Sequence, residues 1–251
     1  MGTLLAVVLA SVRVAAFLWV GLPFRKSVPP FLLALLSVGI AVSLVGGLGP
    51  VPEPPGLGAL AVATAAEVLL GVVLGMLVSA VFNAATLAGE AIAQGLGQGL
   101  QVVLDPVTEH SVTPFSVLIS MLVAGVSVNN GVHTRTLVAI ADGFAMIPPG
   151  AAVRADWTLA RQALVHSAWS SFDVGIQVAV PVMAVGLSIN AATAVLGRLA
   201  PRMNAFFAAG PAIGALFGTA AAAAALPWVV LVLDAFDAQG LAVVARLAGA
   251  P

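Results

Sequence analysis

Long apolar stretches, separated by short polar turns, dominate the chain. A helix needs about 20 predominantly apolar residues to cross a bilayer, because about 30 Å of hydrocarbon is covered at about 1.5 Å per residue. The apolar stretches cover residues 4–20, 31–45, 59–88, 114–128, 174–196 and 206–233. Lipid offers the backbone no hydrogen-bond partners, and the alternation of a transmembrane barrel is absent, so the pattern predicts an all-α integral membrane protein.

Glycine, proline and charge mark the turns between these stretches. Residues 46–58 read GGLGPVPEPPGLG, which cannot sustain a helix and predicts a loop. Residues 137–147 are apolar but short for a span, and Pro148-Pro149-Gly150 is predicted to end that segment. An amphipathic stretch follows, and Pro181 is expected to kink the helix predicted at 174–196. The basic turns fit no ordinary multi-pass topology, since placing one in the cytoplasm leaves another outside.

The composition narrows the class of protein further. Of the 251 residues, 61% are hydrophobic and 8% are charged, whereas soluble domains carry about 25% charged residues, so a water-soluble fold is excluded. A net charge of −1 gives no basic surface for nucleic acid, and a chain without cysteine has no disulfide or thiolate metal site. We therefore expect a single domain with no metal, no cofactor and no nucleic-acid partner. Without a nucleophile elbow or a metal-binding helix, an enzyme is not expected.

Glycines at helical spacing predict close helix packing in two places. Gly71 and Gly75 are one turn apart, and Gly210, Gly214 and Gly218 continue the same spacing over two turns. Such glycines line one face of a helix and let a second backbone approach closely. The pattern does not say whether the second helix belongs to this chain or to another subunit.

A polar stripe runs through the segment after residue 88. Glu90, Gln94 and Gln98 are spaced one helical turn apart, and Gln101 follows a turn later. A face of hydrogen-bonding groups is costly in lipid but not against a water-filled cavity, which favours a pore-facing arm. The alternative is a partly exposed amphipathic hairpin arm.

Glu67 is the one charged residue in the apolar stretch 59–88. A buried carboxylate is costly unless it is paired or protonated, so Glu67 is either a structural partner of a cation or part of a proton relay. No second acidic residue lies in this stretch to complete a relay, which favours the structural pair. Arg13, in the first apolar stretch, is the candidate partner. A small-solute secondary transporter that uses Glu67 remains the alternative function, and it predicts an inverted repeat that is not evident in the sequence.

Three segments together resemble the FliR/SctT family over nearly the whole chain. They read GEAIAQGLGQGLQVVLDP at 89–106, GVHTRTLVAIADGFAMIPPG at 131–150 and AVPVMAVGLSINAATAVLGRLAPRMNAFFAAGP at 179–211. The Gly-Arg-x-x-Pro-x-x-Asn turn at 197–204 is the most specific part. Gly143 and Gly210 stand where the family usually has serine and phenylalanine, which affects local packing more than identity.

The resemblance implies a subunit of the type III export gate. Members of this family look like a FliP-like part, here about 1–160, fused to a FliQ-like hairpin, here about 161–251, and close a helical ring with FliP-type and FliQ-type subunits. FlhB-type and FlhA-type export components are further implied partners. Unfolded flagellar or effector proteins pass the gate at the bacterial inner membrane, in the basal body. The gate lies largely above the membrane plane, which would explain the topology that the basic turns do not fit.

The resemblance also assigns roles to two turns. One would help to plug the central pore, and the hydrogen-bonding arm would lead to it. The other would anchor the tip of the opposite hairpin through Arg198, Pro201, Arg202 and Asn204. The plug turn consists of Asp105, Pro106, Val107, Thr108, Glu109, His110, Ser111, Val112 and Thr113.

Overall fold

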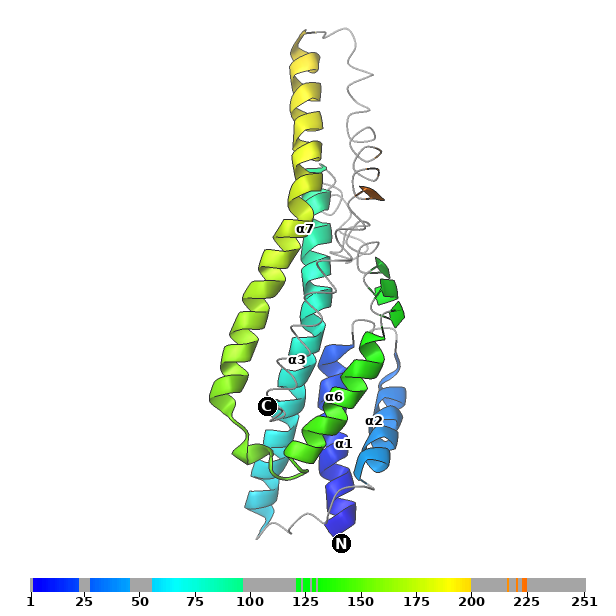
Figure 1. Cartoon of the computed structure of the whole chain (residues 1–251), viewed down its shortest axis with the longest axis vertical. Helices are drawn as coiled ribbons and strands as arrows, with labels where there is room; N and C mark the ends of the chain where they lie inside the picture. The colour runs from blue at the N-terminus through cyan, green and yellow to red at the C-terminus, as the bar shows by residue number, and fades with distance from the viewer. Residues whose placement is uncertain are drawn as a thin grey trace. The chain divides into compact units, whose positions relative to one another are not determined.

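The computed structural model describes residues 2–22, 28–45, 56–96 and 131–199, with a few positions within 121–129 and 216–224. Every regular element in this part of the chain is helical (Figure 1). The elements are α1 (Gly2–Gly21), α2 (Pro30–Val45), α3 (Leu57–Gly95), α6 (Val132–Met146), the 3₁₀ turn η2 (Ala152–Arg154) and α7 (Trp157–Leu199). The predicted all-α fold is confirmed.

Local chemistry explains where several helices begin and end. Pro30 occupies the first position of α2, where its missing N–H costs nothing. At the C-terminal end of α6, the N–H of Ile147 donates to the carbonyl of Gly143, and Pro148 and Pro149 offer no further donors. Asp156 caps α7, because its Oδ1 accepts the N–H groups of Thr158 and Leu159, both at 3.0 Å.

Two helices are longer than the hydrophobic pattern indicates. The apolar run that begins near residue 59 continues through Glu90 as a single helix of 39 residues. The amphipathic stretch after Asp156 and the predicted span at 174–196 likewise form one helix of 43 residues. Pro181 lies inside α7, whose ribbon changes direction part-way along its length (Figure 1). By length and apolar composition α1, α3 and α7 each suffice to cross a membrane.

The chain divides into two compact units that share the long helices. The first comprises Met1–Ala80, Gly131–Trp169 and Asp237–Pro251, and the second comprises Val81–Asn130 and Ser170–Phe236. The first half of α3 and the start of α7 therefore belong to the first unit. Their remaining parts belong to the second.

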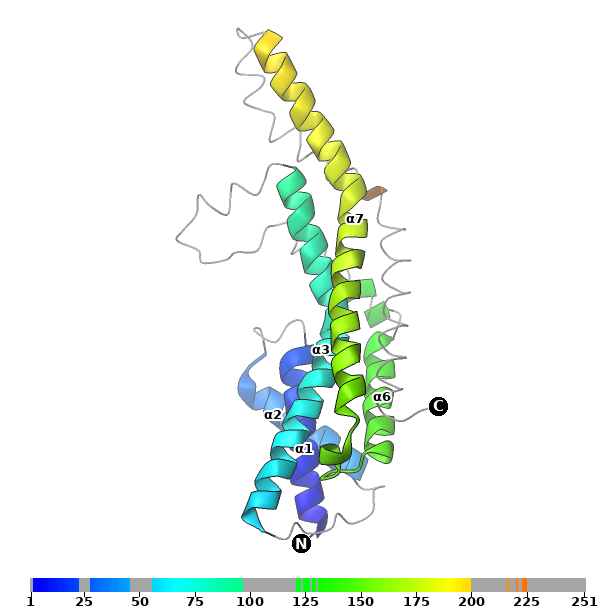
Figure 2. The ribbon, with the colours of Figure 1, turned by 90° about the vertical axis from the view of Figure 1, so that its left-hand side faces the viewer.

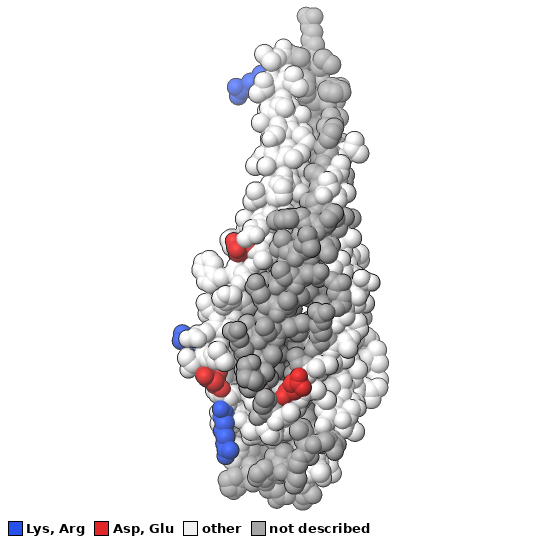
Figure 3. All heavy atoms as spheres, in the orientation of Figure 1, with Lys and Arg blue, Asp and Glu red and all other residues white. Residues whose placement is uncertain are grey.

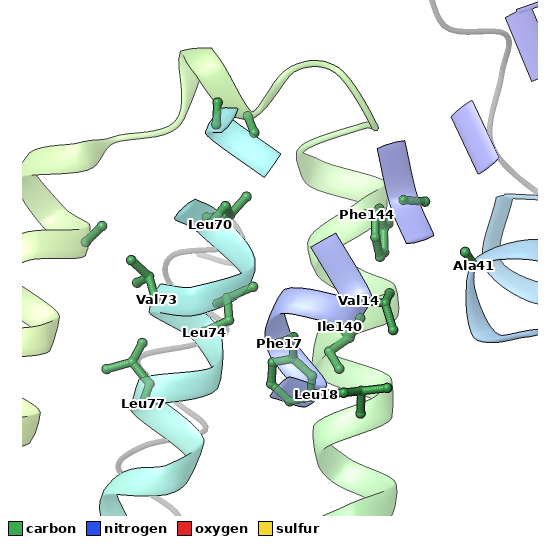
Figure 4. Close-up of a cluster of buried hydrophobic side chains, with 14 of the residues drawn as sticks. Val14, Phe17, Leu18, Ala41, Leu70, Val73, Leu74, Leu77, Ile140 and Phe144 are labelled. Carbon is green, nitrogen blue, oxygen red and sulfur yellow. The ribbon is translucent and has the colours of Figure 1, made fainter. Parts of the chain in front are cut away.

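The core of the first unit is formed where α1, α2, α6, the first half of α3 and the start of α7 meet. Its members are aliphatic or aromatic, with Phe17 and Phe144 as the large aromatic side chains. Figure 4 shows part of this cluster. It includes Val14, Phe17, Leu18, Ala41, Leu70, Val73, Leu74, Leu77, Ile140 and Phe144.

Candidate functional site

A buried ion pair joins α1 to α3 in the first unit. The side chain of Arg13 is 3% exposed and that of Glu67 is 0% exposed. Arg13 Nε donates to Glu67 Oε2 at 2.5 Å, and Arg13 Nη2 donates to Glu67 Oε1 at 3.0 Å. This is the two-pronged geometry in which a planar guanidinium binds a carboxylate most strongly. The pairing predicted from the sequence is confirmed.

The same two side chains also bind the turn that follows α6. Arg13 Nη1 donates to the carbonyl of Ile147 at 2.9 Å, and Nη2 makes a longer contact of 3.5 Å with the carbonyl of Pro148. Glu67 Oε1 accepts the N–H of Gly150 at 2.7 Å. The guanidinium carbon lies 4.3 Å from the centre of the Phe144 ring, in a cation–π contact.

These contacts explain how two charges are tolerated inside an apolar core. Removing an ion pair from water is costly, and mutual attraction offsets that cost only when further hydrogen bonds occupy the remaining donors and acceptors. Here both carboxylate oxygens of Glu67 accept bonds, and Arg13 also donates to the backbone. Among the described residues, no buried side-chain nitrogen or oxygen lacks a partner. The arrangement supports the structural interpretation of Glu67 over a proton relay.

Two glycines of α3, Gly71 and Gly75, face α1 within the same chain. A Cβ added at Gly71 would collide with the carbonyl oxygen of Arg13 and lie 2.9 Å from the Cβ of Ala16. One added at Gly75 would lie 2.8 Å from the carbonyl oxygen of Phe17. The backbone of α1 therefore occupies the space that these glycines leave, and their role is packing inside the chain.

A second close approach, in the second unit, fixes the end of α3 against α7 (Figure 2). A Cβ added at Gly186 would lie 2.7 Å from the carbonyl oxygen of Gly95. The side-chain Nδ2 of Asn190 donates to the same oxygen at 3.1 Å. Carbonyls in the last turn of a helix have no partner within the helix, so Asn190 satisfies one of them. Sequence reasoning did not single out Asn190, because its partner is a backbone atom.

The structure describes only part of the predicted arm and anchor. Glu90 is half-buried and Gln94 is exposed, both in the last turns of α3, whereas Arg198 is exposed in the last turn of α7. A cation suits that position, because it faces the negative end of the helix dipole. The other predicted site residues lie outside the described residues. They are Gln98, Gln101, Asp105, Pro106, Val107, Thr108, Glu109, His110, Ser111, Val112, Thr113, Pro201, Arg202, Asn204, Gly210, Gly214 and Gly218.

Comparison with known proteins places these features in a family. Residues 4–238 match the model of the bacterial export proteins, family 1. The chain belongs to this family, the FliR/SctT family. It is also similar to the flagellar biosynthetic protein FliR of Caulobacter vibrioides, with 29% identity over 179 residues, which are 71% of this chain and 70% of that relative. The ion pair and the contact between Asn190 and Gly95 fall within the matched residues, as do the second unit and most of the first. The family and the long apolar helices together make this chain a membrane-embedded bacterial export protein.

Proposed function

We propose that the chain is a structural and gating subunit of the type III export gate. In this proposal it closes a helical ring with FliP-type and FliQ-type subunits in the basal body at the bacterial inner membrane, next to FlhB-type and FlhA-type components. Unfolded proteins pass through the ring, and the chain itself catalyses no reaction. The name of the Caulobacter relative supports a flagellar rather than an effector system.

The length and exposure of α7 carry this proposal. Its 43 residues extend over about 64 Å, whereas a bilayer offers about 30 Å of hydrocarbon. Only 22% of its most apolar stretch is buried within the chain. Large apolar side chains are exposed along the whole helix, namely Leu159, Val165, Trp169, Phe172, Val180, Val185, Leu187, Val195, Leu196 and Leu199.

Lipid can cover about half of such a helix, so the rest of the apolar surface needs protein neighbours. On the face drawn in Figure 3, charged side chains are few among the described residues, and several of them lie together at the lower left edge. The rest of the described surface on this face is uncharged, as expected of a surface that packs against other subunits. A ring of subunits that extends beyond the bilayer supplies such neighbours.

Within the ring we assign the roles that the resemblance implies. The end of α3, with Glu90 and Gln94, would face the pore, and residues 105–113 would help to plug it. Arg198 and the turn after it would anchor the tip of the hairpin. The division into a FliP-like part and a FliQ-like part belongs to the same proposal. A solute transporter built on Glu67 gains no support, because both oxygens of that carboxylate already accept hydrogen bonds.

Co-expression with the FliP-type and FliQ-type proteins of the same genome tests the proposal. The tagged chain should co-purify with both partners, and native mass spectrometry should show a discrete complex with one copy of this chain. Replacing residues 105–113 by a short Gly-Ser linker should then let a small dye leak from liposomes that contain the complex. A partner-free monomer or dimer would refute the ring, and an unchanged dye leak would refute the plug.

A further inference from the structure

The Arg13 and Glu67 side chains each form hydrogen bonds with the turn after α6, one as donor and the other as acceptor. Charge neutralisation alone would not require this order of the two charges. The guanidinium faces the carbonyl groups of Ile147 and Pro148, which can only accept hydrogen bonds. The carboxylate faces the N–H of Gly150, which can only donate. Donors at position 13 and acceptors at position 67 thus match the backbone of the turn.

The turn has one backbone hydrogen bond of its own, from the N–H of Ala151 to the carbonyl of Pro148 at 3.0 Å. Pro148 and Pro149 contribute no N–H groups, and Gly150 adopts a φ of 86°, a conformation that favours glycine. Ile147 and Pro148 lie just beyond the last helical residue of α6, where carbonyl groups have no partner within the helix. The carbonyl of Pro148 accepts the N–H of Ala151, whereas the carbonyl of Ile147 accepts its hydrogen bond from Arg13. The positive guanidinium also faces the negative end of the α6 dipole, so Arg13 caps this helix from a distant part of the sequence.

We propose that Arg13 and Glu67 act as a directional clamp on the turn at 147–150, and that this clamp fixes the start of α7 against α1 and α3. Both are positioning residues. Ala152 and Ala160, which follow the turn, are buried in the core of the same unit, at 0% and 2% exposure. Losing the clamp therefore exposes the turn and η2 before it disturbs the packing of α1 with α2. The inference concerns the chain alone and does not depend on the export function.

An exchange of the two charges separates a clamp from a mere ion pair. In the double variant Arg13→Glu, Glu67→Arg the ion pair is restored, but a carboxylate now faces two carbonyl oxygens and a guanidinium faces an N–H group. Charge neutralisation alone predicts that the exchange keeps the turn in place. The directional clamp predicts that the turn comes loose.

A cysteine reporter reads the position of the turn directly, because the natural chain contains no cysteine. Ala152→Cys places a thiol at a site that is 0% exposed next to the turn, and Ala41→Cys places a matched thiol at a site in α2 that is also 0% exposed. Each is introduced separately into the full-length chain in detergent and treated with a water-soluble maleimide. In the exchanged variant, labelling at position 152 should accelerate by about tenfold or more, since hydrogen bonds to charged groups are lost, while labelling at position 41 stays slow.

A pair of milder variants decides the matter even if the exchanged chain does not fold. Glu67→Gln and Glu67→Met both remove the charge, but only the amide keeps an oxygen that can accept the N–H of Gly150. Position 152 should stay protected at least about threefold better in Glu67→Gln than in Glu67→Met. Equal labelling of these two variants would overturn the clamp, as would slow labelling at position 152 in a folded exchanged variant. Equally fast labelling at positions 41 and 152 in Glu67→Met would also overturn it, because the pair would then hold the whole unit rather than the turn.

Discussion

At the scale of single residues, glycine allows close contacts between the described helices. Gly71 lies against the carbonyl oxygen of Arg13, so α1 and α3 approach most closely next to the buried ion pair. A methyl group added there has no space, whereas Gly39 in α2 has nothing within 4 Å of the corresponding position. These two helical glycines differ in surroundings and allow a matched comparison.

Gly71→Ala should therefore lower the free energy of unfolding by about 1–3 kcal/mol, because overpacking forces the two backbones apart. Gly39→Ala should raise it by up to about 1 kcal/mol, since alanine favours a helix over glycine. Thermal unfolding in detergent, followed by circular dichroism, measures both. If both variants change the free energy of unfolding in the same direction, the inference that α1 leaves no space for a side chain at position 71 is wrong.

Asn190 makes the second contact that a single substitution can isolate. Asn190→Leu has a similar volume but no donor for the carbonyl oxygen of Gly95, so we expect a loss of about 0.5–1.5 kcal/mol in the free energy of unfolding. Asn83 is exposed on α3, and Asn83→Leu serves as the matched control, with an expected change within about 0.5 kcal/mol. Equal losses in both variants would show that the Asn190 side chain contributes nothing specific.

At the scale of elements, the sequence predicts helix positions better than helix lengths. Proline marks the start of α2, and Pro148, Pro149 and Gly150 mark the turn after α6, and the structure agrees there. The ends of the apolar stretches near residues 88 and 174 do not end helices, because Glu, Gln, Arg and Ala in the flanking segments favour the helix nearly as well. Hydrophobicity reports what surrounds a helix, whereas helix ends depend on caps and breakers.

For the buried ion pair, the sequence indicates the side-chain partner but not the backbone partners. A buried carboxylate in an apolar helix is costly unless it is paired or protonated, so the sequence favoured a cationic partner for Glu67 and offered Arg13 as the candidate. The structure confirms that partner. The turn that binds both side chains was not predictable, because its groups at Ile147, Pro148 and Gly150 belong to the backbone. Side-chain identity carries no signal for such partners.

The N-terminal cap of α7 allows a prediction about the stability of a whole helical turn. Asp156→Ala removes the cap that accepts the N–H groups of Thr158 and Leu159, and should destabilise the first turn by about 1 kcal/mol. Hydrogen exchange at these two amides should accelerate several-fold. Asp173→Ala, which removes an exposed side chain in the middle of α7 that accepts a hydrogen bond from Gln177, should leave both amides unchanged. Unaltered exchange in Asp156→Ala would exclude the capping role.

At the scale of the whole molecule, the two long helices α3 and α7 carry exposed apolar surface that other molecules must cover. Both α3 and α7 contribute to both compact units, so each unit depends on helices that continue beyond it. The helix α3 is about 58 Å long and α7 about 64 Å long, and both lengths exceed the hydrocarbon thickness of a bilayer, about 30 Å. Partner subunits are therefore expected to cover surface that the chain leaves exposed.

Val165 and Leu196 test this expectation, because both are exposed and about 46 Å of helix separates them. The natural chain has no cysteine, so Val165→Cys and Leu196→Cys each provide a unique thiol. In detergent, both should react with a water-soluble maleimide when the chain is purified alone. In the complex with FliP-type and FliQ-type partners, at least one should become protected by about tenfold or more, since a helix this long needs protein neighbours outside the bilayer. If neither thiol is protected in a complex of confirmed composition, the exposed side of α7 does not face the ring, and the observation that carries the export-gate proposal loses its explanation.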